Sequence, residues 1–213
     1  MFAERFSKFF MSTPGLITTC VVIVLLTLTF ALNLRKSKKL SAKALTYAAI
    51  CIALATVLSN VKLLHLPYGG TLTACSMVFI SFIGFWFGSF AGITAAVAYG
   101  LLQLVLDPHV IHPVQILLDY PVAFGMLGIS GFFANRKYGL YTGFVVGALG
   151  RALCSTLSGV IFFAEYAGEQ NVWIYSTLYN LSYIVPEIIL TVLLISIPPM
   201  KKAILQVKSS VAV

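Results

Sequence analysis

Seven long apolar stretches dominate this sequence, and each is close to the length of a membrane-spanning helix. They cover residues 15–34, 43–64, 72–88, 90–106, 112–134, 139–165 and 173–198. A helix needs about 20 mainly apolar residues to cross a bilayer. The chain is 60% hydrophobic and 9% charged, too little polar surface to cover a soluble core. The runs are continuous, unlike the alternating strands of a barrel, so we expect an all-α polytopic membrane protein.

The first stretch is separated from the others by the basic linker NLRKSKKLSAK. We therefore expect three parts. Residues 1–40 form an N-terminal transmembrane anchor with a basic cytoplasmic linker, residues 41–200 a six-helix substrate-binding membrane domain, and residues 201–213 a cytoplasmic basic tail. A cleaved secretory signal is the alternative for the first stretch, but its apolar region is long and no clear cleavage site follows.

Basic residues gather on one side of this seven-span arrangement. They are Arg35, Lys36, Lys38, Lys39, Lys43, Arg136, Lys137, Lys201, Lys202 and Lys208. The positive-inside rule makes that side cytoplasmic, which places the C-terminus in the cytoplasm and the N-terminus outside. Topology thus explains the formal net charge of +8, and no basic patch with interleaved aromatics indicates nucleic acid.

No enzyme motif is present, so we expect neither catalysis nor a cofactor. The sequence lacks a P-loop, HExxH, GxSxG and a Ser/His/Asp set. His109 and His112 have a spacing compatible with metal binding, but both lie beside prolines in a predicted loop. Four cysteines, in or beside apolar stretches and without CxxC spacing, are typical of core residues.

Ionisable residues inside apolar stretches are the first candidates for function, because a charge near the bilayer centre costs at least about 2.5 kcal/mol. A polar site open to the outside is predicted by three residues that share one helix face: His112, Gln115 and Asp119. The alternative is that Asp119 only accepts hydrogen bonds from neighbouring helices. Counted from the outer ends of the last two helices, Arg151 and Glu187 lie at similar depth in the membrane. This predicts a structural ion pair between them.

Aromatic and amide side chains are concentrated in the last third of the chain. Among them are Phe163, Tyr175 and Asn180. Together with a carboxylate, aromatic rings suit a flat, cationic, nitrogen-rich ligand. Earlier in the chain, Ala49 and Ala53 share a helix face that lets another helix approach closely, either in this chain or in a partner. The segment LPYGGTLTACS predicts a loop, either a gate over a site or a plain connector.

Four motifs give the chain a resemblance to a known family: PYGGTLT, HPVQILLDYPVAFGMLGISGFF, LSGVIFFAEYA and VWIYSTLYNLSYIVPE. They resemble the thiamine-specific S component of energy-coupling factor (ECF) transporters, over roughly residues 43–200. The resemblance implies a six-helix body that holds thiamine near the outer surface. It also implies a transmembrane coupling subunit and two ATPase subunits, which use the ATP, and a coupling contact through Ala49 and Ala53.

The resemblance also implies a set of ligand contacts. Asp119 and Tyr120 match the family's acidic-Tyr pair, and Tyr175 and Asn180 match its Tyr and Asn on the last helix. With Gln115, His112, Ser155 and Phe163 they form the expected ligand-binding set. Three positions depart from the family pattern: Ser155 replaces a His, Phe163 stands where some members have Trp, and Gly70 where some have a loop Trp.

We therefore expect a membrane subunit that captures thiamine, or a related small cationic vitamin, for an ATP-driven importer in the cell membrane. The departures leave a thiamine precursor or another vitamin as an alternative ligand. A proton-coupled secondary carrier and a structural or assembly membrane protein are the alternative functions.

Overall fold

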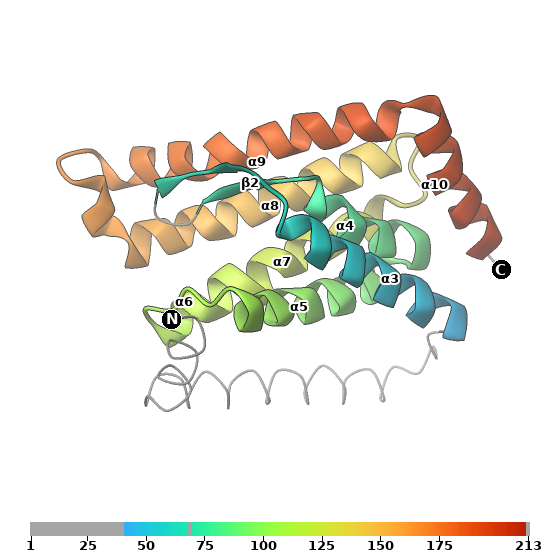
Figure 1. Cartoon of the computed structure of the whole chain (residues 1–213), viewed down its shortest axis with the longest axis horizontal. Coiled ribbons are helices and arrows are strands. Elements are labelled where there is room, and N and C mark those ends of the chain that lie inside the picture. Colours follow the sequence, from blue (N-terminus) through green and yellow to red (C-terminus); the bar gives the residue numbers. More distant parts are fainter. Residues whose placement is uncertain (1–40, 68–69, 212–213) are drawn as a thin grey trace.

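The computed structural model describes residues 41–67 and 70–211, and its helices form an elongated bundle (Figure 1). The predicted first span at 15–34 and residue Gly69 lie outside the described residues. Helix α3, Ala42–Ser59, opens the described part; the Ser41 hydroxyl caps it by accepting the Ala44 N–H at 3.1 Å. Half of the α3 residues are exposed and only Ala44, Cys51 and Ala55 are buried, so one of its faces is left uncovered.

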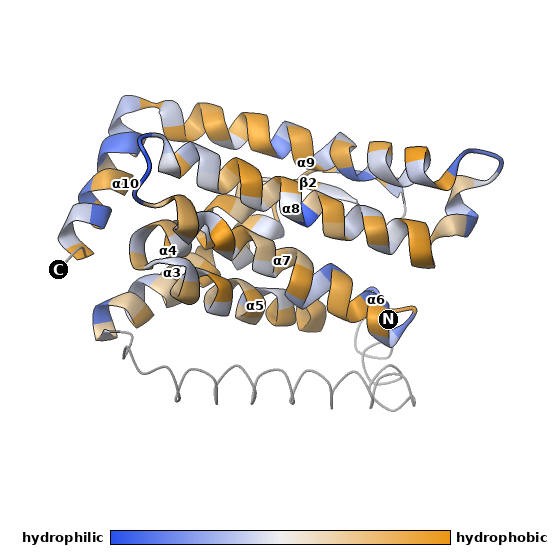
Figure 2. Ribbon diagram, turned by 180° about the vertical axis from the view of Figure 1, so that it is seen from behind, coloured by the Kyte–Doolittle hydropathy of each residue, from blue (hydrophilic) through white to orange (hydrophobic). Residues whose placement is uncertain are grey.

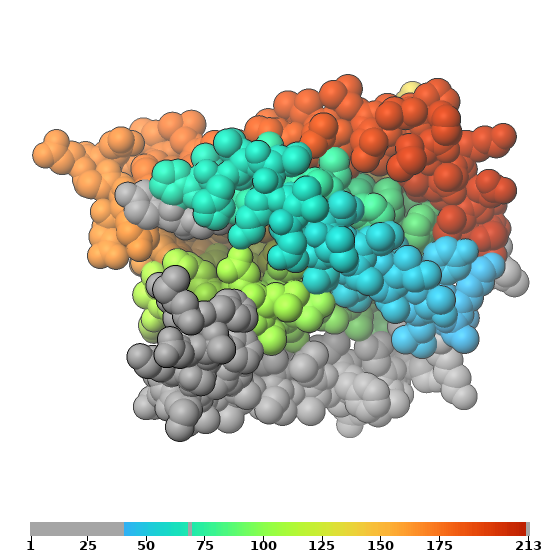
Figure 3. Space-filling view, in the orientation of Figure 1, coloured from blue at the N-terminus to red at the C-terminus, as the bar shows by residue number. Residues whose placement is uncertain are grey.

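A short antiparallel hairpin follows α3 and is absent from the sequence-based expectation. Strand β1, Lys62–His65, pairs with β2, Thr71–Thr73, with Leu64 opposite Leu72. The spans expected at 43–64 and 72–88 are therefore wrong at these ends. A short apolar strand and the end of an apolar helix have similar composition. Hydropathy alone therefore assigned the strand residues to the neighbouring helices. In Figure 3 the hairpin segment lies at the surface beside α9.

Helices α4, Ser76–Phe87, and α5, Ser89–Leu106, are joined at Gly88, whose φ of 89° lies in the left-handed region. The two helices approach closely at Gly92. A Cβ there would lie 2.5 Å from the Gly84 Cα and 2.6 Å from the Gly128 carbonyl oxygen. Small residues at such crossings let backbones pack where no water drives association.

The next span is broken into four short segments. They are α6, Pro113–Leu117; the π-turn η2, Leu118–Val122; α7, Ala123–Gly125; and the 3₁₀ segment η3, Met126–Phe133. Pro121 has no N–H to donate, so a regular α-helix cannot continue through it. Single π-turns of this kind are frequent at functional sites, and this one contains Asp119.

Two long helices and a crossing helix complete the described chain. Helix α8, Gly139–Phe162, leads through η4, Ala164–Ala167, to α9, Val172–Ser196. Helix α10, Pro198–Val211, then turns across the end of the bundle (Figure 1). The segment predicted as a basic tail is thus helical through Val211.

Several contacts hold α10 against the bundle. Trp86 Nε1 donates to the Ile204 carbonyl at 3.0 Å. The Lys208 amino group donates to the Ala134 carbonyl and lies 4.0 Å from the Phe85 ring centroid. Burial lowers the pKa of Lys208.

The described residues form a multi-pass membrane protein. Five helical segments among them are long and apolar enough to cross a membrane: Ala42–Ser59, Ser89–Leu106, Pro113–Phe133, Gly139–Phe162 and Val172–Ser196. Helix α4 has 12 residues and is shorter than a full span. Figure 2 shows hydrophobic residues along these helices and hydrophilic ones gathered in α10 and the connecting loops. The all-α fold class is confirmed, with the short hairpin as an addition.

Candidate ligand site

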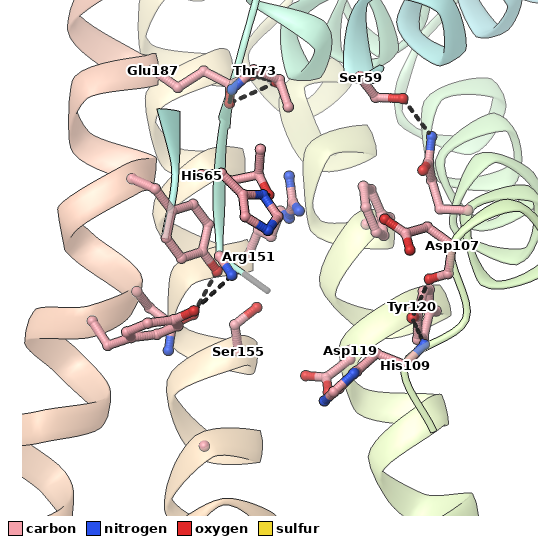
Figure 4. Close-up of a pocket in the computed structure, with 18 of the residues that line it drawn as sticks. Ser59, His65, Thr73, Asp107, His109, Asp119, Tyr120, Arg151, Ser155 and Glu187 are labelled. Carbon is pink, nitrogen blue, oxygen red and sulfur yellow. Dashed lines mark hydrogen bonds between the residues drawn. The ribbon is translucent and has the colours of Figure 1, made fainter. Parts of the chain in front are cut away.

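A cavity of about 470 Å³ lies between the hairpin, α5, η2, α8 and α9. Figure 4 shows the side chains that line it, with Asp119, Tyr120 and Asp107 across the space from Ser155. Six of the eight ligand contacts expected from sequence line this cavity. They are Asp119, Tyr120, Ser155, Phe163, Tyr175 and Asn180.

Asp119 is held in place by a neighbouring amide. Gln115 Nε2 donates to Asp119 Oδ2 at 2.5 Å and to the His109 carbonyl at 3.1 Å. Its Oε1 accepts the Ile111 N–H at 3.2 Å. Every polar atom of this buried amide is thus used to fix the carboxylate and the loop before α6.

His112 and Gln115 do not line the cavity, contrary to the expected stripe with Asp119. His112 is exposed and precedes α6, where its Nδ1 accepts the Val114 N–H at 3.2 Å. Its ring stacks on Phe162 with centroids 5.2 Å apart. Gln115 is 1% exposed and points into the packed wall. His112 leaves the stripe because the helix begins after it, whereas Gln115 keeps the expected face and bonds Asp119 within the wall.

Tyr120 ties the loop before α6 to the cavity wall. Its hydroxyl accepts the His109 N–H at 2.8 Å and donates to the Asp107 carbonyl at 2.9 Å. Asp107 is also joined to Lys62 on β1 by an ion pair of 3.6 Å. The loop that carries His109 is therefore fixed from both sides of the cavity mouth.

Two rows of aromatic rings face the cavity. His109, Phe163 and Tyr166 stack in one row, with centroid separations of 5.6 and 5.9 Å. Tyr175, Tyr179 and Tyr183 form the other row along α9, with separations of 6.1 and 6.0 Å. Two aromatic walls with a carboxylate near them suit a flat cation.

The amide of Asn180 belongs to the second row. Its Oδ1 accepts the Tyr183 hydroxyl at 2.6 Å, and its Nδ2 donates to the Ser176 carbonyl at 2.9 Å. The Asn180 side chain is buried, so these bonds fix its orientation. The amide still borders the cavity, one turn from Ser176.

Tyr179 connects α9 to the hairpin loop. Its hydroxyl accepts the Gly70 N–H at 2.6 Å and donates to the Pro67 carbonyl at 2.5 Å. A Cβ at Gly70 would lie 2.7 Å from that hydroxyl oxygen. A side chain at position 70 would therefore collide with Tyr179, which gives a local reason for glycine there.

Glu187 fixes the other end of the hairpin, and the ion pair expected between it and Arg151 is wrong. The ion pair found among the described residues joins Lys62 and Asp107. Glu187 instead accepts the Thr73 hydroxyl at 2.9 Å and the Met77 N–H at 3.3 Å. The carboxylate is thus used at the N-terminus of α4, where a negative charge is favourable.

Arg151 instead packs against an aromatic face. Its guanidinium carbon lies 4.2 Å from the centroid of the Phe124 ring. Its Nε is buried and has no hydrogen-bond partner. The side chain borders the cavity about one helical turn from Ser155.

The set of ligand contacts expected from sequence did not include Tyr179, Tyr183, His109 or Arg151, which also line the cavity. A signal was present for the tyrosines, since 175, 179 and 183 are four apart and share a helix face. Arg151 likewise lies four residues before Ser155. His109 carried no such pattern, because a loop places it.

Comparisons with known proteins agree with this architecture. A family model described as "Thiamine transporter protein" matches residues 45–207. The chain is 37% identical over 159 residues to the thiamine transporter ThiT of Bacillus subtilis, covering 67% of this chain and 82% of that one. It is 26% identical over 121 residues to ThiT of Lacticaseibacillus paracasei, covering 48% of this chain and 60% of that protein.

A solved structure of ThiT from Listeria monocytogenes has the same fold. The TM-score is 0.61 at 22% sequence identity, and the match covers 74% of this chain and 96% of that chain.

Proposed function

The chain belongs to the thiamine transporter family, and we propose that it captures thiamine for an ATP-driven importer. The observation that carries the proposal is the Asp119 carboxylate beside two aromatic rows in one cavity. Thiamine joins a positively charged thiazolium ring to a flat aminopyrimidine. Both rings can stack on aromatic faces, and a carboxylate offsets the positive charge.

Each expected contact that lines the cavity has a role in this proposal. Asp119 accepts from the aminopyrimidine or neutralises the thiazolium charge, and Gln115 keeps its carboxylate in place. Asn180 and Tyr175 orient the polar edges of the ligand, while Tyr120 and Phe163 contact its rings. Ser155 leaves space where the family resemblance implies an imidazole, so stacking on the row of His109 and Phe163 is expected to matter more here.

The orientation in the membrane follows from the basic residues. Lys201, Lys202 and Lys208 lie on α10, and Arg136 and Lys137 lie in the loop before α8. The positive-inside rule places this end of the bundle in the cytoplasm. The cavity mouth, formed by the loop before α6 and the start of α9, then faces outward, where it can collect the vitamin.

The proposed ATP-driven import calls for a partner, because the sequence contains no P-loop with which to bind ATP. Ala49 and Ala53 are exposed on α3, next to exposed Leu54 and Val57. Four-residue spacing of small side chains lets another helix pack closely in lipid. This α3 face is proposed to contact an ECF coupling subunit that associates with two ATPases.

Equilibrium binding to the purified full-length chain in detergent tests the proposal. Saturable binding of thiamine, with riboflavin and biotin unable to compete, is the expected result. A well-folded protein that does not bind thiamine would refute it. Copurification of a coupling subunit and two ATPases from membranes tests the partner assignment separately.

A further inference from the structure

Arg151 is a positively charged side chain inside a cavity proposed to bind a cation, and its role needs a separate explanation. It lies on α8 four residues before Ser155, which places it about 6 Å nearer the α10 end. Figure 4 shows Arg151 among the lining side chains, above Ser155 and across the space from Asp107. The guanidinium thus borders the inner part of the cavity, away from the mouth.

The described part of the protein leaves the Arg151 donors largely unused. Its Nε is buried without a hydrogen-bond partner, and the ion pair among the described residues involves Lys62 and Asp107 instead. A guanidinium has five N–H donors and no acceptor. Contact with the Phe124 face is favourable, but a ring face supplies no oxygen acceptor for these N–H donors.

The nearby carboxylates are already engaged elsewhere. Glu187 accepts from Thr73 and from the Met77 N–H, and Asp119 is bound by Gln115. Both carboxylates are still within electrostatic reach of Arg151, as are the hydroxyls of Tyr99 and Tyr183. Their charge offsets the field of the guanidinium, so a cationic ligand can enter, but they leave the donors of the guanidinium unfilled.

A guanidinium binds oxygen acceptors, and phosphate most strongly because two N–H groups can bond to it at once. We propose that Arg151 is a specificity-determining contact for the oxygen-bearing tail of the ligand. The tail is the hydroxyethyl group of thiamine or a phosphate ester at the same position. The ligand then lies along the cavity with its cationic ring near Asp119 and its tail toward Arg151. This inference rests on the proposed function and adds a second recognition point to it.

The test compares three ligands on three proteins. The ligands are thiamine, the analogue in which ethyl replaces hydroxyethyl, and thiamine monophosphate. The proteins are the wild type, Arg151→Met and Arg151→Lys. Arg136→Met is the matched control, because Arg136 also lies over a ring, at 5.7 Å from Phe133, but outside the cavity. Dissociation constants are measured by titration in detergent, and thermal unfolding checks that each variant is folded.

For Arg151→Met we expect affinity to fall about tenfold for thiamine, about a hundredfold for the monophosphate and less than about twofold for the ethyl analogue. Arg151→Lys should retain part of the affinity for the monophosphate, because it keeps the charge but loses the bidentate geometry. Equal losses for all three ligands would overturn the proposal and make Arg151 a structural residue. If the wild type bound none of them, the proposed function would fail as well.

Discussion

The hydroxyl of Tyr179 on α9 bonds to both sides of the hairpin loop, accepting the Gly70 N–H at 2.6 Å and donating to the Pro67 carbonyl at 2.5 Å. One side chain therefore joins the long α9 helix to the loop that borders the cavity. Two predictions follow from this link, one for the hydroxyl and one for the glycine.

Tyr179→Phe removes both bonds and keeps the ring. We expect thiamine to dissociate several-fold faster, since a loop that is no longer fixed opens at lower cost, with little change in the association rate. Stopped-flow measurement of both rates checks this. Tyr138→Phe is the control, because Tyr138 is 60% exposed and does not line the cavity. An unchanged dissociation rate in Tyr179→Phe would contradict the role of the link.

Gly70→Ala places a Cβ 2.7 Å from the Tyr179 hydroxyl oxygen. The loop or the tyrosine must shift, so thiamine affinity should fall about fivefold to a hundredfold, which corresponds to the cost of about 1–3 kcal/mol at overpacked sites. Gly125→Ala is the matched control, because its nearest contact would be Val97 Cγ2 at an ordinary 3.4 Å. Equal affinities of the two variants would show that position 70 tolerates a side chain.

Glu187 is predicted to stabilise the fold through the hairpin and not through Arg151. Glu187→Gln turns an amide N–H₂ toward donors, among them the Thr73 hydroxyl and the Met77 N–H. The free energy of unfolding should fall by about 1–3 kcal/mol, measured by denaturant titration in detergent. Glu165→Gln, at an exposed site in η4, should change it by less than about 0.5 kcal/mol. Equal stabilities of the two variants would count against this role.

Substitutions on the exposed face of α3 are expected to abolish transport and to leave ligand binding unchanged. Ala49→Trp and Ala53→Trp place bulky groups on exposed positions, so thiamine binding by the purified chain should be unchanged. Uptake in cells with a coupling subunit and ATPases should be lost, because the helices can no longer approach closely. Leu153→Trp on α8, at a residue that is 59% exposed, is the control for bulk at a lipid-facing position. Normal uptake by both alanine variants would place the coupling contact elsewhere.

The long helices were predictable from the sequence to within a few residues. Stretches 90–106, 139–165 and 173–198 correspond to Ser89–Leu106, Gly139–Phe162 and Val172–Ser196. A long uninterrupted apolar run crosses a bilayer as an α-helix, because the helix bonds its backbone groups within the segment. The hairpin was not predictable in this way, since its strands have only four and three residues.

The same contrast between regular helices and irregular segments applies to the residues of the candidate site. Tyr175 and Asn180 lie on a regular helix, so spacing placed them correctly at the cavity. His112 does not line the cavity, because the helix begins only at Pro113, and Gln115 meets Asp119 as expected but from within the wall. Arg151 was assigned to a carboxylate on charge and depth alone. Which partner a buried carboxylate accepts from depends on loop geometry that spacing does not encode.

Asp119 is proposed to recognise the positive charge of thiamine. Titration of thiamine into Asp119→Asn and Asp107→Asn tests it most directly, because both carboxylates line the same cavity while Asp107 is ion-paired to Lys62 at the mouth. We predict that Asp119→Asn raises the dissociation constant about tenfold to a hundredfold, and that Asp107→Asn changes it less than about threefold. Wild-type affinity in folded Asp119→Asn would show that this carboxylate does not recognise the charge of the ligand.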